Sequence, residues 1–335
     1  MKKIFSFILA AVFVISICLS MQSCKASEVY TEGEGELKVV CTTFAPFDLA
    51  RAVGGDRISL SLLQDSGADL HNYTPTVATL DALRNADVFI YIGGASDSWV
   101  EKTVKAAENP DLITLCLMDY ITPVDAELEN DWSSYDDGDH EHHGHEHGHE
   151  HGHEHDHGAD EHIWTSVKNA KIMVNAIKDT FVKCDVDGKQ SYESRTASYI
   201  SELDKLDSEL EALSLVIGES PMLFADRFPF VYLMHDYHIK YMAAFSGCSS
   251  ETNSGFEVQI DLINAVKENS LDFVITLEGG DKSIAEAIAN ETGCQIITLD
   301  SLQSISKADI ASGKTYLSAM KQNIAAIKEA YHVTD

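Results

Sequence analysis

Beyond its first 21 residues, the sequence has no apolar run long enough to cross a bilayer. Basic residues are few, since 24 Lys and Arg stand against 54 Asp and Glu, and the formal net charge of −30 disfavours a nucleic-acid partner. The seven cysteines form no CxxC pair, and the G-x-S-x-G signature of serine hydrolases does not occur. What remains is an acidic chain whose surface suits a cationic partner.

The first segment has the pattern of an export signal. Lys2 and Lys3 precede an apolar run that ends near Cys24, so we expect a signal peptide over residues 1–23. A small residue before a cysteine is typical of bacterial lipoproteins, in which the new N-terminal cysteine is acylated. We therefore expect Cys24 to carry a lipid and residues 24–36 to form a flexible tether. Cleavage without lipid is the alternative, and it would leave the chain periplasmic.

Two groups of apolar, β-branched runs predict two α/β lobes. In each group the runs alternate with helical patterns, which is typical of a mainly parallel sheet covered by helices. We expect the first lobe over residues 37–188 and the second over 218–335. The expected strands are 37–44, 58–64, 87–94 and 112–118, followed by 221–227, 239–245, 272–278 and 294–300.

A long helix is predicted between the lobes. Residues 189–217 contain neither Gly nor Pro, and a stripe of apolar residues recurs at three- and four-residue steps. The stripe comprises Leu203, Leu206, Leu210, Leu213 and Ile217. We interpret this segment as a rigid linking helix, with a coiled-coil partner as the alternative.

Residues 139–161 form a histidine-rich run built on Gly-His-Glu-His. Glycine at every fourth position and the lack of apolar residues predict a disordered loop. Its imidazoles suit zinc, copper or nickel, but a chain without fixed structure holds each ion loosely. The run contains His140, His142, His143, His145, His147, His149, His151, His153, His155 and His157.

Three further residues lie at the ends of predicted strands or loops, where α/β folds place their ligands. His71 follows the second expected strand in "GADLHNYTPT", and His162 follows the histidine-rich loop in "DEHIW". Asp300 ends the last expected strand, in "IITLDSL". The three together are a stronger indication of a fixed site, separate from the histidine-rich loop, than any one of them alone.

These segments resemble a known family. "GADLHNYTPT" is similar to the H-x-Y-x-P segment of the zinc- and manganese-binding lipoproteins of bacterial ABC importers, the ZnuA/TroA-like family. "DEHIW" resembles its D-P-H-x-W segment, and the C-terminal "LDSL" and "GKTYLSAMKQNIAAIKEA" resemble its carboxyl end. The resemblance implies two lobes joined by one long helix. It also implies metal binding by His71 and His162 from the first lobe and Asp300 from the second.

One departure leaves a further ligand open. The family has His or Glu before an A-F-x-Y segment, where this sequence has Arg227. An arginine has no lone pair to offer a metal. The candidates for the missing ligand are Asp226, Glu251 and Glu278, and we expect Arg227 to orient a ligating carboxylate by an ion pair.

The resemblance implies the solute-binding component of a metal importer, a monomer that is not an enzyme. Its cargo would be Zn(II), because two imidazoles and one or two carboxylates suit tetrahedral zinc. Its partners would be an ABC permease, the ATPase of that permease and the membrane. A manganese-binding homologue, a zinc-dependent hydrolase and a periplasmic metal buffer or adhesin are the alternatives.

Overall fold

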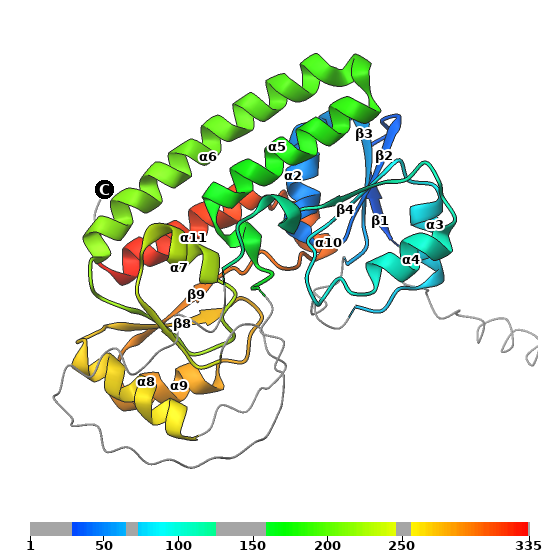
Figure 1. Cartoon of the computed structure of the whole chain (residues 1–335). Coiled ribbons are helices and arrows are strands. Elements are labelled where there is room, and N and C mark those ends of the chain that lie inside the picture. Colours follow the sequence, from blue (N-terminus) through cyan, green and yellow to red (C-terminus); the bar gives the residue numbers. More distant parts are fainter. Residues whose placement is uncertain (1–28, 65–72, 125–158, 246–255, 334–335) are drawn as a thin grey trace, which may run out of the picture.

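The computed structural model describes residues 29–64, 73–124, 159–245 and 256–333. Two α/β lobes lie side by side and a layer of long helices crosses both (Figure 1). This arrangement is the fold class that the sequence predicts. No helix in these four ranges is both long and apolar enough to cross a membrane.

The first sheet has five strands in the order β1-β3-β2-β4-β5. β1 runs antiparallel to β3, and the other pairs are parallel. The two faces of this sheet contribute to different clusters of apolar side chains. Val39 of β2 packs in the cluster on one face, and Val40 packs in the cluster on the other face. The strands are β1 (Tyr30–Glu32), β2 (Leu37–Cys41), β3 (Ile58–Leu62), β4 (Val88–Tyr91) and β5 (Ile113–Cys116).

Helices cover both faces of this sheet. α3 packs against α4 on one face, and α2 packs against α5 on the other. The helices are α2 (Phe44–Gly54), α3 (Val77–Arg84), α4 (Val100–Ala107) and α5 (Val167–Cys184). Short 3-10 turns are η1 (Gly55–Arg57), η3 (Met118–Tyr120), η5 (Ile163–Thr165) and η6 (Val186–Gly188).

The second sheet has four parallel strands in the order β7-β6-β8-β9. The strands are β6 (Met222–Phe224), β7 (Tyr241–Ala243), β8 (Phe273–Leu277) and β9 (Gln295–Leu299). The helices are α7 (Val231–Tyr237), α8 (Phe256–Glu268), α9 (Ser283–Thr292), α10 (Lys307–Ser312) and α11 (Tyr316–Ala330).

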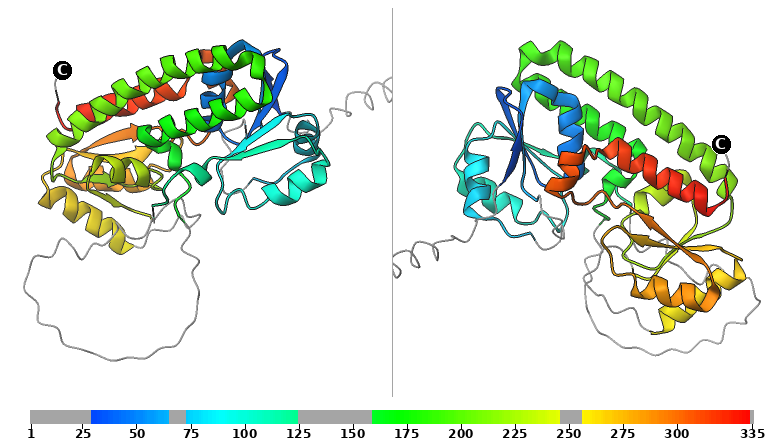
Figure 2. Two further views of the ribbon diagram at one scale, coloured as in Figure 1. Left: turned by 45° about the horizontal axis from the view of Figure 1, so that its top comes forward. Right: turned by 180° about the vertical axis from the view of Figure 1, so that it is seen from behind.

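Helix α6 (Lys189–Ile217) runs along both lobes, as Figures 1 and 2 show from opposite sides. It packs on α2 and α5 of the first lobe and on α7 and α11 of the second. All members of the predicted apolar stripe are buried. Because they are covered by this same chain, the stripe needs no partner and the coiled-coil alternative is wrong.

The structure differs from the sequence predictions at two places near the first sheet. β1 lies within residues 24–36, so the expected flexible tether is wrong for Tyr30–Glu32. The pattern "PTVATLDALRNA" predicts a helix with Pro75 in its first turn, but α3 begins at Val77 and is capped by the hydroxyl of Thr76. The signal peptide, Cys24, His71, Glu251 and residues 139–158 of the histidine-rich run lie outside the described residues.

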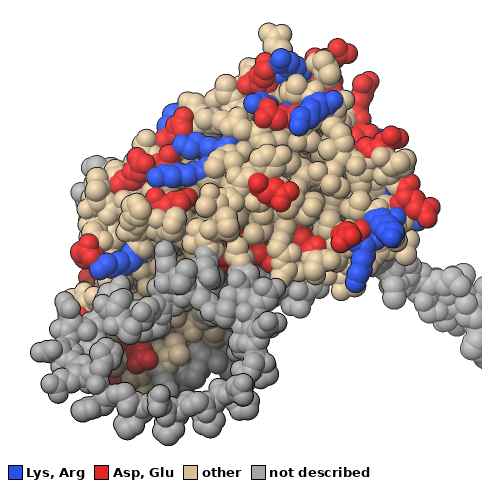
Figure 3. Space-filling model, viewed as in Figure 1, with Lys and Arg blue, Asp and Glu red and all other residues tan. Residues whose placement is uncertain are grey.

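Acidic and basic side chains are interspersed on the face shown in Figure 3. Many of the basic groups are paired, for example Lys171 with Asp204 and Asp207 on the surface of α5 and α6. No broad basic area appears among the described residues on this face.

Candidate metal centre

The carboxyl ends of the second sheet place several polar side chains together. β8 and β9 are parallel neighbours, with Leu277 opposite Leu299, so the residues that follow them, Glu278 and Asp300, emerge at one edge. Both line a cavity of about 270 Å³, together with Arg227 and Lys314. The sheet topology therefore creates a pocket with charges of both signs.

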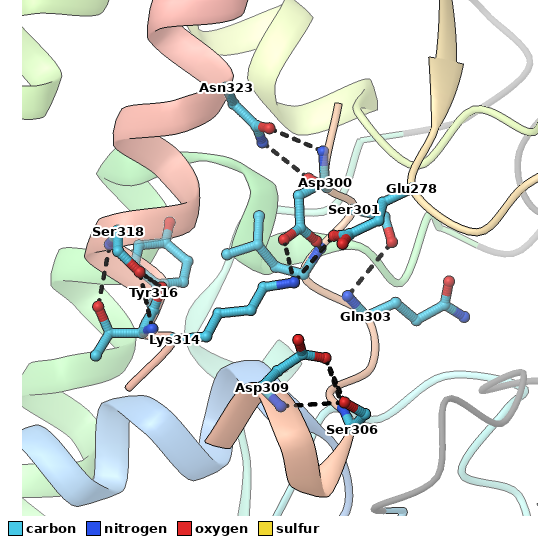
Figure 4. A network of polar contacts seen from close by, with 12 residues as sticks. Glu278, Asp300, Ser301, Gln303, Ser306, Asp309, Lys314, Tyr316, Ser318 and Asn323 are labelled. Carbon is cyan, nitrogen blue, oxygen red and sulfur yellow. Dashed lines mark hydrogen bonds and ion pairs between the residues drawn. The ribbon is translucent and has the colours of Figure 1, made fainter. Parts of the chain in front are cut away.

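Asp300 is held firmly at this edge. The backbone N–H of Leu302 donates to Asp300 Oδ1 over 2.8 Å. The amide side chain of Asn323 bonds both the backbone N–H and the backbone carbonyl of Asp300, each over 2.8 Å (Figure 4). The side chain is only 11% exposed. Asp300 is thus a fixed carboxylate whose second oxygen, Oδ2, faces the pocket cation Lys314.

Lys314 bridges the two carboxylates of the pocket. Its Nζ lies 2.6 Å from Asp300 Oδ2 and 2.9 Å from Glu278 Oε2. Figure 4 shows these residues at close range. Burial by itself lowers the pKa of Lys314. The hydrogen bonds and negative charges of Asp300 and Glu278 outweigh that effect and raise the pKa above its ordinary value. The lysine is therefore a fixed positive charge in this state of the molecule.

His162 lies on the short segment that precedes η5, and its side chain is only 2% exposed. Asp160 Oδ1 lies 3.0 Å from His162 Nδ1. The same oxygen accepts a hydrogen bond from the backbone N–H of His162 over 2.8 Å. A carboxylate at Nδ1 favours the tautomer that carries its proton there, which leaves the lone pair on Nε2. This Asp–His pair has the arrangement that supports a metal-binding imidazole.

Hydrogen bonds join the His162 segment to the Asp300 segment. Trp164, whose ring packs 5.2 Å from that of His162, donates its indole N–H to the carbonyl of Ser301 over 2.9 Å. Tyr316 at the start of α11 donates its hydroxyl to the carbonyl of Trp164 over 2.8 Å. The two predicted ligands are thereby carried on segments that contact each other between the lobes.

Asp226 is engaged within its own lobe. Its Oδ1 accepts the backbone N–H of Arg227 over 2.8 Å, and its Oδ2 accepts the hydroxyl of Thr276 over 2.9 Å and the backbone N–H of Leu277 over 3.1 Å. Through these bonds Asp226, which follows β6, connects the end of that strand to β8. Arg227 lines the same pocket as Asp300 and Glu278, and its expected ion pair remains a prediction.

A second pair of acids is buried beside the His162 segment. Asp97 and Glu161 are 5% and 8% exposed. Asp97 Oδ2 accepts the N–H of Gly93, and Glu161 Oε1 accepts the N–H of Ser96, each over 2.9 Å. Burial raises the pKa of Asp97 to about 6, with a further contribution from the charge of Glu161 and opposition from the Gly93 N–H.

In the described part of the chain, no three His, Cys, Asp or Glu side chains form a ready metal cluster. His162 and Asp300 lie on connected segments, whereas His71, Glu251 and the ten loop histidines fall outside the described ranges. Sequence reasoning missed Lys314 and the role of Asp160. For Asp160 the sequence did contain a signal, because an acidic residue two positions before a candidate ligand histidine can form a hydrogen bond with the imidazole ring.

Comparison with known proteins agrees with this fold. The zinc-binding lipoprotein AdcA of Streptococcus pneumoniae is 27% identical over 98% of this chain, which spans 61% of the length of that relative. The high-affinity zinc uptake system protein ZnuA of Bacillus subtilis is 27% identical over 97% of this chain and 96% of its own length. The crystal structure of the Zn(II)-bound ZnuA-like domain of AdcA has a TM-score of 0.69 at 22% identity, covering 89% of this chain and 99% of that domain, and shows the same fold.

The family described as "Zinc-uptake complex component A periplasmic", ZnuA, matches residues 39–330, which include the second sheet, the linking helix α6 and strands β2 to β5 of the first sheet apart from the first two residues of β2. The match extends from β2 to the end of α11 and covers most of the 335 residues. The chain therefore belongs to the ZnuA family of zinc-uptake components.

Proposed function

We propose that this chain captures Zn(II) between its two lobes and delivers it to a membrane permease driven by an ATPase. The observation that carries the proposal is the buried His162, held at Nδ1 by Asp160 on a segment bonded to the one that carries Asp300. A neutral imidazole and a carboxylate are ligands that zinc prefers. The names of the relatives, which refer to zinc binding and zinc uptake, support the same cargo.

The proposed site consists of His71, His162 and Asp300. His71 is included because its segment resembles the H-x-Y-x-P segment of the family. The surroundings of the other two residues are described above. Two imidazoles and one carboxylate occupy three positions of a tetrahedral zinc site and leave a fourth for water or a further carboxylate. Manganese prefers a site rich in oxygen, so two imidazoles favour zinc over manganese.

The ten histidines of residues 139–161 act as a collector in this proposal. Many weak sites on one segment raise the zinc concentration near the proposed site between the lobes, and none of them holds an ion tightly. The site between the lobes then selects the ion, because His162 and Asp300 are held in place before zinc arrives. The histidine-rich run therefore supplies the site and does not form it.

We further propose that the chain works outside the cytoplasm, tethered to the membrane by a lipid on Cys24, and that it acts as a monomer. The family description as a periplasmic component and the lipoprotein name of one relative support this location. The same description concerns metal uptake, which disfavours the alternative of a zinc-dependent hydrolase.

Zinc uptake by intact cells tests the proposal. Cells that lack this chain should accumulate radioactive zinc slowly when external zinc is scarce, and the parent chain should restore the rate. Normal uptake without the chain would contradict a transport role and favour a metal buffer or an adhesin. Uptake of manganese in place of zinc would favour the manganese-binding alternative.

Two variants extend this experiment to the site. Asp300→Ala should fail to restore uptake, because it removes one of few direct bonds to the ion. Asp272→Ala should restore it, because Asp272 precedes β8 at the other end of the strand and its side chain is 76% exposed. Full rescue by Asp300→Ala would contradict the ligand assignment.

A further inference from the structure

Lys314 lies where a positive ion at Asp300 would lie. Its Nζ is 2.6 Å from Asp300 Oδ2 and 2.9 Å from Glu278 Oε2, while Asp300 Oδ1 already accepts the N–H of Leu302. The oxygen of Asp300 that faces the pocket is therefore occupied by an ammonium group. A divalent cation that binds this oxygen must displace the lysine, because two positive charges would otherwise lie within a few ångströms of each other.

The backbone of Lys314 does not depend on its side chain. Gly313 precedes it with φ +84 as the C-cap of α10, and Thr315 follows it as the N-cap of α11 with a capping box. The carbonyl of Lys314 also accepts a hydrogen bond from Arg51 of α2 over 3.2 Å. With its backbone fixed on both sides and tied to the first lobe, the side chain can change partners while the loop stays in place.

The two carboxylates around Lys314 differ in a way that assigns them different roles. Asp300 is 11% exposed and held by Leu302 and Asn323, as expected for a ligand positioned in advance. Glu278 is 58% exposed and can follow the lysine toward solvent. A lysine displaced from Asp300 thus keeps one ion pair, with Glu278, and its charge is not left unpaired.

Resting on the proposed zinc function, we propose that Lys314 is an internal competitor of the metal. It neutralises Asp300 while the cleft is empty, and it moves to Glu278 when zinc binds Asp300. Glu278 is then the acceptor that releases Asp300 and is not itself a metal ligand. Cations that interact weakly with Asp300 fail to displace the lysine, so Lys314 sets a threshold for entry into the site.

Chelator competition on the full chain tests this inference, with a chelator strong enough to keep weak sites empty. Lys314→Met should raise zinc affinity on the order of tenfold, because zinc no longer has to displace a positive charge from Asp300. Lys321→Met is the matched control, because Lys321 lies on α11 and is 54% exposed, and it removes the same charge. Lys314→Arg keeps the charge and should stay near the parent affinity.

Glu278→Gln separates the two roles of that residue. In the parent background it should weaken zinc binding severalfold, because Lys314 loses its second partner and stays on Asp300. In the Lys314→Met background it should have no effect. A loss that persists in the double variant would make Glu278 a ligand and would overturn the inference.

An unchanged or lower affinity of Lys314→Met, with its thermal midpoint equal to that of the parent, would also overturn the inference. If this variant unfolds at a lower temperature, Lys314→Gln provides the same comparison with a polar side chain. Failure of the parent chain to bind one zinc tightly would instead overturn the proposed function, so the two failures are distinguishable.

Discussion

Asp160 sets the orientation and the tautomer of His162 in this account, so its removal should weaken zinc binding. Asp160→Ala removes the acceptor at Nδ1 and should cost about ten- to a hundredfold in affinity, the range for groups that orient a metal-binding histidine. Asp160→Asn keeps an oxygen that can accept the same hydrogen bond and should cost less. Chelator competition measures both, and parent-like binding by Asp160→Ala would remove the support for His162 as a ligand.

Asp97 gives a prediction about stability and pH. Its pKa in the folded chain is raised to about 6, first by burial, whereas an unfolded Asp titrates near ~3.9. Between these values the folded chain binds more protons than the unfolded chain, so the free energy of unfolding falls as pH rises through this window. The loss in the parent reaches at most about 3 kcal/mol, at 1.36 kcal/mol for each pKa unit.

Asp97→Asn removes this titration and keeps an oxygen for the Gly93 N–H. The variant should therefore gain stability relative to the parent between about pH 4 and about pH 7. Denaturant unfolding of the metal-free proteins at both pH values measures the difference. Other charged groups are the same in both proteins, so their effects cancel in the difference in unfolding free energy between variant and parent. If this difference is the same at both pH values, Asp97 does not titrate as described.

Much of the candidate site could be predicted at the residue scale, and the reason for the remainder is physical. His162 and Asp300 belong to short motifs at the ends of loops or strands, and such motifs can be recognised in one sequence. Lys314 could not be found in this way, because its meeting with Asp300 and Glu278 depends on how α10, β8 and β9 pack. The sequence shows only a lysine between a glycine and a threonine.

At the scale of elements, the buried stripe of α6 makes a direct test of the linking helix. Leu210 is fully buried, whereas Leu215, five residues further along the helix, is 85% exposed. Leu210→Ala should destabilise the chain by about 2–5 kcal/mol, as large-to-small changes in a core do. Leu215→Ala should lie within about 0.5 kcal/mol of the parent. Equal effects in denaturant unfolding would contradict the described packing of α6.

The eight strands expected from apolar runs all form, because short apolar runs that alternate with helical patterns indicate the strands of a parallel sheet in sequence alone. β1 escaped prediction because Tyr30–Glu32 contains no apolar run, and only pairing with the distant β3 makes it a strand. α3 begins after Pro75 because the hydroxyl of Thr76 accepts the N–H of Thr79 and caps the helix there. The local sequence pattern therefore shows where helices and strands occur. Long-range strand pairing and helix caps determine where they begin and end.

At the scale of the whole molecule, the proposed function separates a specific cleft from a collecting segment. Calorimetry of the metal-free mature chain should show one tight zinc and several weak ones. Removal of residues 140–157 should abolish the weak class and leave the tight one, because His162 and Asp300 remain. Loss of tight binding in this deletion would place the specific site in the histidine-rich run.

In the proposed site, zinc would also tie the lobes together, since His162 belongs to the first lobe and Asp300 to the second. The most direct test is anomalous diffraction at the zinc edge from crystals of the chain with one equivalent of zinc. We predict that the strongest peak lies about 2 Å from both His162 Nε2 and a carboxylate oxygen of Asp300. A strongest peak beyond bonding distance of either residue would contradict the account.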